Sequence, residues 1–136
     1  MTPVAELTDT FAVAGQIQPS DVAEFARQGY QVLICNRPDN EEMNQPSMDT
    51  IEAACGAAGI TLVRYPVTAM SFPGDDLAAM EDAMSGDVKT LAYCRSGARS
   101  ASVWVATLSG DQRTAAAHRA PQFGIALTFV MQLGFS

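Results

Sequence analysis

The sequence VKTLAYCRSGARS, residues 88–100, leads from a short apolar run directly into a turn of small and basic residues. The apolar run favours a strand, and the residues from Arg99 onward favour a helix. Gly97 permits a backbone conformation that other residues rarely adopt, which suits a sharp junction between the two elements. A strand, a tight turn and a helix in this order are typical of an α/β fold.

Similar pairs of strands and helices are predicted on both sides of this stretch. Strands are expected at residues 11–15, 31–36, 61–67 and 88–93. Helices are expected at residues 19–27, 46–58, 75–84, 99–108, 111–118 and 122–133. This alternation predicts parallel strands joined by right-handed crossovers. We therefore expect one domain, residues 1–136, with the fold of a three-layer α/β sandwich around a mainly parallel sheet.

Composition and charge disfavour several classes of function. The chain has 15 acidic and 8 basic residues and a formal net charge of −7, so we expect neither nucleic acid nor an anionic membrane as a partner. No apolar run approaches the ~20 residues of a membrane span, and no signal peptide begins the chain, so we expect a cytoplasmic protein. Three cysteines and one histidine, without a Cys-x-x-Cys pair, predict no disulfide framework, no metal site and no cofactor.

Cys94 stands at the C-terminal end of a predicted parallel strand, where the active sites of such sheets lie. Backbone amides at the start of the next helix attract an anion, and the same field stabilises the thiolate of a nucleophilic cysteine. Arg99 can bind an oxyanion through two parallel hydrogen bonds, and Ser100 can donate one toward the sulfur. The predicted catalytic residues are Cys94, Arg99 and Ser100. The predicted anion-binding residues are Arg95, Ser96, Gly97, Ala98, Arg99 and, from another loop, Arg37.

Several residues outside this loop have two interpretations. Arg37 is either an additional anion contact or a salt bridge within its own loop. The candidate acids are Glu41, Asp75 and Asp76, but Glu41 is also typical of a solvated surface, and the two aspartates are typical of a helix's first turn.

Two further features also remain open. Cys35 is interpreted as a core residue, with a resolving thiol for Cys94 as the alternative. The apolar segment 122–133 either packs on the sheet or forms the contact of a homo-oligomer.

The segment CRSGARS, residues 94–100, resembles the active-site loop of rhodanese sulfurtransferases and, less closely, the signature loop of cysteine-dependent phosphatases. The wider chain resembles a bacterial family, the phosphatase-like domain of beta-lactamase-hydrolase-like proteins. The resemblance rests on NRP at residues 36–38, Glu41 and Glu42, QPS at 45–47, Pro66 and Val67, and the loop itself. It runs from about Leu7 to Leu108, and the family's closing Gly-Tyr-Asp segment is absent near residues 121–124.

This resemblance implies a fold similar to the dual-specificity phosphatases. It also implies that Cys94 is the nucleophile, that the amides of residues 95–99 bind the anion and that Arg99 binds the oxyanion. Members of the family are described as phosphatases and as sulfurtransferases, the latter often beside persulfide-oxidising partner enzymes.

Two sequence features favour sulfur transfer. Only four residues separate Cys94 from Arg99, whereas cysteine phosphatases have five, and loops of this length resemble rhodanese sites for one sulfur atom. The loop at residues 68–74 contains no acid that could protonate a leaving oxygen, and a thiolate leaving group needs none. We therefore expect a sulfurtransferase that forms a Cys94 persulfide on a small anionic or persulfide substrate. A phosphatase acting through a Cys94 phosphocysteine is the alternative, and a non-catalytic anion-binding or redox module is the third possibility.

Overall fold

The computed structural model describes residues 2–127, in which five strands form one sheet of order β1-β2-β5-β3-β4. The strands are β1 (Val4–Glu6), β2 (Phe11–Ala14), β3 (Val32–Cys35), β4 (Thr61–Arg64) and β5 (Thr90–Tyr93). The last four run parallel, whereas β1 pairs with β2 in the antiparallel direction at the edge of the sheet. The predicted α/β fold with a mainly parallel sheet is confirmed. The sequence analysis missed β1, a three-residue strand too short to carry a hydrophobic pattern.

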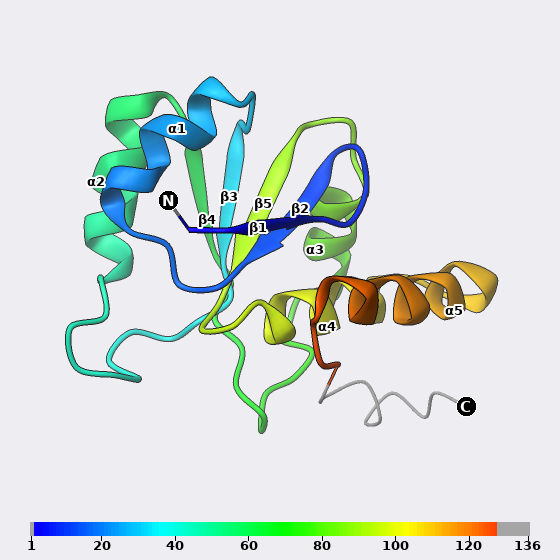
Figure 1. The fold of residues 1–136 in the computed structure, drawn as a ribbon. Coiled ribbons are helices and arrows are strands. Elements are labelled where there is room, and N and C mark those ends of the chain that lie inside the picture. Colours follow the sequence, from blue (N-terminus) through cyan, green and yellow to red (C-terminus); the bar gives the residue numbers. More distant parts are fainter. Residues whose placement is uncertain (1, 128–136) are drawn as a thin grey trace.

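Helices cover both faces of the sheet, which gives the three predicted layers (Figure 1). One face carries α1 (Val22–Arg27), which continues a 3-10 turn at Pro19–Asp21, and α2 (Met48–Ala58). The other carries α3 (Leu77–Met84), α4 (Ala98–Thr107) and α5 (Gly110–Arg119). Strand residues alternate between two cores: Leu33 and Leu91 pack toward α1 and α2, whereas Ile34 and Ala92 pack toward α3 and α4. The central strand, β5, therefore contributes residues to both cores.

The helix boundaries follow from capping residues that the sequence contains. The side chain of Ser47 accepts a hydrogen bond from the amide of Thr50 at the start of α2, and Gly59 ends that helix with a φ of 77°. Asp76 begins α3 by accepting a hydrogen bond from the amide of Ala79 at 3.2 Å. The caps at Ser47 and Asp76 set the ends of the loops that precede α2 and α3.

The loops that follow β3, β4 and β5 leave the sheet at the same edge, as expected for parallel strands (Figure 1). They comprise residues 36–47, 65–76 and 94–97. The register pairs Cys35 with Tyr93, so that the first residues of two loops, Asn36 and Cys94, emerge side by side. This edge carries the candidate site.

The predicted helix at residues 122–133 is wrong over its described part. A 3-10 turn at Ala120–Phe123 ends at Gly124, whose φ of 80° is left-handed, and residues 125–127 are not helical. Pro121 begins the turn and Gly124 stops it, so an apolar composition does not suffice for a helix here. Residues 128–133 lie outside the described part of the chain, and the subunit contact stays a prediction. Among residues 2–127, no helix has the length and apolar character to cross a membrane.

Candidate active site

The loop after β5 folds around the sulfur atom of Cys94. The amide of Gly97 donates a hydrogen bond to Cys94 Sγ at 3.1 Å. Gly97 has a φ of 93°, and this left-handed residue turns the chain into α4, whose first amides also point toward the loop. A thiolate at Cys94 is therefore stabilised by an N–H group and by the positive end of a helix dipole.

The end of β2 holds the other side of the loop. The amide of Cys94 donates to the carbonyl of Ala14 at 3.3 Å, and the amide of Gln16 donates to the carbonyl of Arg95 at 3.2 Å. A Cβ atom at Gly15 would lie 3.0 Å from that same carbonyl of Arg95, closer than ordinary contact. Glycine at position 15 thus lets two backbones approach and keeps the Cys94 loop in place.

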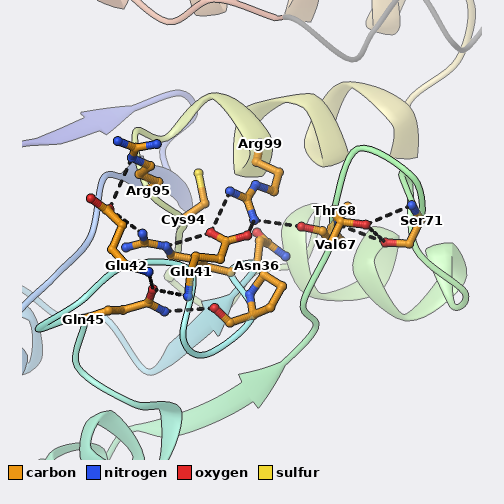
Figure 2. A network of polar contacts seen from close by, with 12 residues as sticks. Asn36, Glu41, Glu42, Gln45, Val67, Thr68, Ser71, Cys94, Arg95 and Arg99 are labelled. Carbon is orange, nitrogen blue, oxygen red and sulfur yellow. Dashed lines mark hydrogen bonds and ion pairs between the residues drawn. The ribbon is translucent and has the colours of Figure 1, made fainter.

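The guanidinium of Arg99 faces a carboxylate from the loop after β3 (Figure 2). Its Nη1 donates to Glu41 Oε2 at 3.0 Å and to the carbonyl of Val67 at 2.9 Å. Its Nη2 donates to Glu41 Oε1 at 3.1 Å. Arg99 is thereby fixed by side-chain and backbone oxygens from two loops, while none of the described residues accepts a hydrogen bond from its Nε.

Arg37 is a buried cation rather than an open anion contact. It is 1% exposed, and its three nitrogens donate to Glu41 Oε1 at 2.9 Å, to Gln16 Oε1 at 3.0 Å and to Glu42. The salt bridge that the sequence analysis gave as the alternative therefore describes these contacts. A substrate anion could reach Arg37 only by displacing one of its present partners.

The two glutamates of this loop each bridge two arginines. Glu41 joins Arg37 to Arg99, and Glu42 joins Arg37 to Arg95, whose Nε lies 3.2 Å from Glu42 Oε1. We call this alternating series of five side chains, Arg99, Glu41, Arg37, Glu42 and Arg95, the ion chain. It connects the two ends of the Cys94 loop to a buried guanidinium. Every member was named from the sequence, and a salt bridge of Arg37 within its own loop was one of its two interpretations. Nothing in the sequence indicated the contacts of Glu41 with Arg99 or of Glu42 with Arg95.

The three candidate acids have other partners or lie elsewhere. Burial raises the pKa of Glu41, but hydrogen bonds from Arg99 and Arg37 outweigh this effect and hold the pKa below its usual value. Glu41 is therefore ionised at neutral pH and carries no proton to donate in this state. Asp76 caps α3, and Asp75 lines a separate cavity of about 420 Å³ beside Arg64 and Tyr65.

Two buried polar groups next to the loop lack partners. The Oγ atom of Ser100 has no hydrogen-bond partner among residues 2–127, so the predicted bond toward the sulfur is not present. The amide of Gly97 occupies that role instead. Asn36, named from the sequence only within the NRP motif, is fully buried. Its Oδ1 has no hydrogen-bond partner among residues 2–127, whereas its Nδ2 donates to the carbonyl of Tyr65 at 3.0 Å. A polar residue ending the apolar run at residues 31–35 was the available signal.

The other cysteines differ from Cys94 in their surroundings. Cys35 packs between the sheet and α1 and α2 beside Tyr93, and burial raises its pKa. Burial likewise raises the pKa of Cys55 to about 11. These surroundings agree with the interpretation of Cys35 as a core residue, and they disfavour thiolate chemistry at either position.

Comparison with known proteins identifies the family. The model of the phosphatase-like domain of beta-lactamase hydrolase-like proteins matches residues 4–111. The chain belongs to this family.

Curated relatives of this phosphatase-like domain are much longer than the chain. The beta-lactamase hydrolase-like protein of Xylella fastidiosa is 34% identical over 97 residues, which cover 71% of this chain and 22% of the relative. The protein of the same description from Agrobacterium fabrum is 29% identical over 100 residues, covering 73% and 23%. The chain thus spans less than a quarter of the length of these relatives.

Solved structures similar to the phosphatase-like domain include several phosphatases. A candidate phosphatase from Neisseria meningitidis has a TM-score of 0.73 and 28% identity over 94% of each chain. Tk-PTP in its active form has a TM-score of 0.67 and 20% identity, covering 95% of this chain and 91% of that one. Kinase associated phosphatase reaches 0.63 and 13%, covering 85% and 80%. At their low identity, the last two show the shared fold alone. The comparisons favour the phosphatase alternative and give no support to the sulfurtransferase that the sequence analysis preferred.

Proposed function

We propose that this chain is a cysteine-dependent phosphatase that hydrolyses phosphate monoesters through Cys94. The observation that carries the proposal is the 3.1 Å hydrogen bond from the amide of Gly97 to Cys94 Sγ at the start of α4. This arrangement favours a thiolate and offers amides to an anion bound next to it. The family of the chain and the phosphatases among its structural relatives support the same chemistry.

The reaction would proceed in two displacements at phosphorus. In the first, the Cys94 thiolate forms an S–P bond while the ester P–O bond breaks and the leaving group departs with that electron pair. In the second, a water oxygen forms a bond to phosphorus, the S–P bond breaks, and the water proton passes to the solvent. The products are inorganic phosphate and the restored thiolate. The amides of the Cys94 loop and the Nε edge of Arg99 would bind the non-reacting phosphate oxygens throughout.

The proposed mechanism provides no described side chain that would protonate the leaving oxygen. An alkoxide needs a proton as the P–O bond breaks, whereas a phenolate leaves as an anion. Glu41 is ionised beside two arginines, and Asp76 is bound to the first turn of α3. We therefore propose aryl phosphates, or esters with similarly acidic leaving groups, as the favoured substrate class.

Sulfur transfer is the second candidate, because only four residues separate Cys94 from Arg99. In that reaction the thiolate attacks the outer sulfur of thiosulfate, the S–S bond breaks, and sulfite leaves with the electron pair. The Cys94 persulfide would then pass its outer sulfur to cyanide or to a thiol.

One experiment separates the two candidates. Hydrolysis of p-nitrophenyl phosphate and transfer of sulfur from thiosulfate to cyanide are measured on the wild type and on Cys94→Ser under the same conditions. We expect ester hydrolysis by the wild type, a fall below about 1% in Cys94→Ser, and sulfur transfer at the background rate. Sulfur transfer that depends on Cys94, without ester hydrolysis, would reverse the ranking. Ester hydrolysis that survives in Cys94→Ser would exclude Cys94 as the nucleophile.

A further inference from the structure

We propose that Glu41 is the positioning residue for Arg99, holding one edge of its guanidinium so that the other edge stays free for an oxyanion at Cys94. The inference rests on the proposed function only in requiring an oxyanion next to the thiolate. It holds equally for a phosphate ester and for thiosulfate.

The hydrogen bonds of Arg99 divide its guanidinium into two edges. Glu41 binds the terminal edge, formed by Nη1 and Nη2, with both carboxylate oxygens at 3.0 and 3.1 Å. The carbonyl of Val67 accepts the second Nη1 hydrogen. The hydrogens that remain, on Nε and on Nη2, project side by side from the other edge, and none of the described residues accepts a hydrogen bond from Nε. Such a pair matches two oxygens of a tetrahedral anion.

Glu41 is itself held in place. Its Oε1 accepts from Arg37 Nε at 2.9 Å, and Arg37 is almost entirely buried. Its backbone amide donates to Gln45 Oε1 at 3.1 Å, and Gln45 in turn donates to the carbonyl of Pro38 at 2.9 Å. The Glu41 carboxylate therefore links a buried cation of fixed position to the guanidinium of Arg99 in the first turn of α4.

A competing role for Glu41 would be that of an internal inhibitor that occupies the anion site. The two roles differ in whether the substrate needs the edge of the Arg99 guanidinium that Glu41 occupies. An inhibitor must be displaced by the substrate, whereas a positioning residue remains bound while the substrate binds. Because Nε and one Nη2 hydrogen of Arg99 are free of described acceptors, an oxyanion can bind there with the Glu41 contact intact.

The test is a double-mutant cycle that uses tungstate, a tetrahedral dianion, as the binding probe. Tungstate affinity is measured by calorimetry on the wild type, Glu41→Gln, Arg99→Lys and the double variant. We expect Glu41→Gln to weaken tungstate binding about tenfold or more, because an amide offers one acceptor where two are needed. In the Arg99→Lys background, Glu41→Gln should change tungstate affinity by less than about twofold. Lysine has no guanidinium, so Glu41 has no terminal edge to hold.

Controls separate positioning from general damage to the fold. Glu52→Gln breaks another Glu–Arg bridge, the exposed contact of Glu52 with Arg64 at 3.4 Å, and should leave tungstate binding unchanged. Thermal unfolding shows which variants fold, and Glu41→Asp replaces Glu41→Gln should the latter fail to fold. Asp keeps the charge but shortens the reach, so we expect intermediate affinity.

Several outcomes would overturn the inference. Tighter tungstate binding by Glu41→Gln would make Glu41 an inhibitor, and equal effects in both Arg99 backgrounds would mean that it acts through another group. Unchanged tungstate affinity in Glu41→Gln would also refute the positioning role. The assay of ester hydrolysis tests the proposed function separately. If the Glu41 and Arg99 variants show no coupling in tungstate binding but ester hydrolysis is intact, only the positioning role is refuted. Coupled tungstate binding without ester hydrolysis refutes only the phosphatase.

Discussion

The loops after β3 and β4 both reach the Cys94 loop, yet they contribute to it very differently. The loop at residues 36–47 supplies Arg37, Glu41 and Glu42, whose charges form the core of the ion chain. The loop at residues 65–76 supplies one backbone acceptor, the carbonyl of Val67. In the proposed reaction, the first loop would therefore position the arginines beside the Cys94 thiolate, whereas the second loop would supply no side chain to protonate the leaving group.

The polar groups of the second loop mostly satisfy one another. Thr68 and Ser71 exchange hydrogen bonds, the hydroxyl of Tyr65 donates to the carbonyl of Pro73 at 2.9 Å, and Asp76 caps α3. These contacts shape the loop and leave its side chains unconnected to Arg99 (Figure 2). The following predictions test whether the contrast between the two loops is functional.

The largest expected effect concerns the leaving group. With no acid supplied by the second loop, kcat/KM should fall by about a hundredfold or more from p-nitrophenyl phosphate to a simple alkyl phosphate. Steady-state assays on a series of phosphate monoesters with graded leaving-group acidity would measure the slope. Equal rates across the series would mean that an acid acts in the reaction after all.

The next effect concerns the buried cation of the first loop. Arg37→Ala removes the residue to which both carboxylates are bound, and it should lower the free energy of unfolding by about 2–3 kcal/mol. Urea denaturation measures this change. Arg64→Ala is the matched control, because its exposed bridges to Asp49 and Glu52 should contribute less than about 1 kcal/mol. Equal losses in the two variants would remove the distinction between buried and exposed bridges.

A smaller effect follows from the depressed pKa of Glu41. A carboxylate whose pKa is lower in the folded state stabilises the fold above its ordinary value, 4.5, and loses that contribution as the pH falls through the folded pKa. The stability difference between the wild type and Glu41→Gln should therefore be constant near neutral pH and shrink below pH 4.5. Urea denaturation at pH 7 and at about pH 3.5 compares the two. A difference that grows toward acid would contradict the assigned direction.

The smallest effect belongs to the second loop. Thr68→Ala should change the kcat/KM of aryl phosphate hydrolysis by less than about twofold, because among residues 2–127 the Thr68 side chain forms hydrogen bonds only with Ser71 of its own loop. The thermal unfolding midpoint should fall slightly, since two local hydrogen bonds with Ser71 are lost. A loss of activity comparable with that of Glu41→Gln would show that both loops matter alike.

The elements around the site were predictable because their patterns are local. Apolar runs located β3 and β5, and the helices predicted at residues 46–58 and 75–84 correspond to α2 and α3. Cys94 at the end of β5 followed from the same reasoning. The family was also recognisable from short motifs, and the family model confirms it.

The connections within the site were not predictable in the same way. Glu41 and Arg99 are 58 positions apart, and nothing in either segment indicates that a carboxylate would meet that particular guanidinium. Apolar content likewise predicted a helix at residues 122–133, although Pro121 and Gly124 set a short turn that ends at residue 123. In the first case a long-range contact decided the structure, and in the second a helix-breaking proline and glycine outweighed local composition. The choice between phosphate and sulfur rested on the length of the Cys94 loop and on the lack of an acid at residues 68–74, and neither feature indicates which charges surround the loop.

The ion chain also has a consequence for how fast substrates arrive. It contains three cations and two anions, so it presents a small positive excess within a chain of net charge −7. A dianionic substrate approaching from a distance therefore meets repulsion first and attraction only near the site. Added salt screens the distant charges more strongly, since the screening length is roughly 10 Å at 0.1 M ionic strength. The rate of association with a dianionic substrate should therefore not fall as the ionic strength rises.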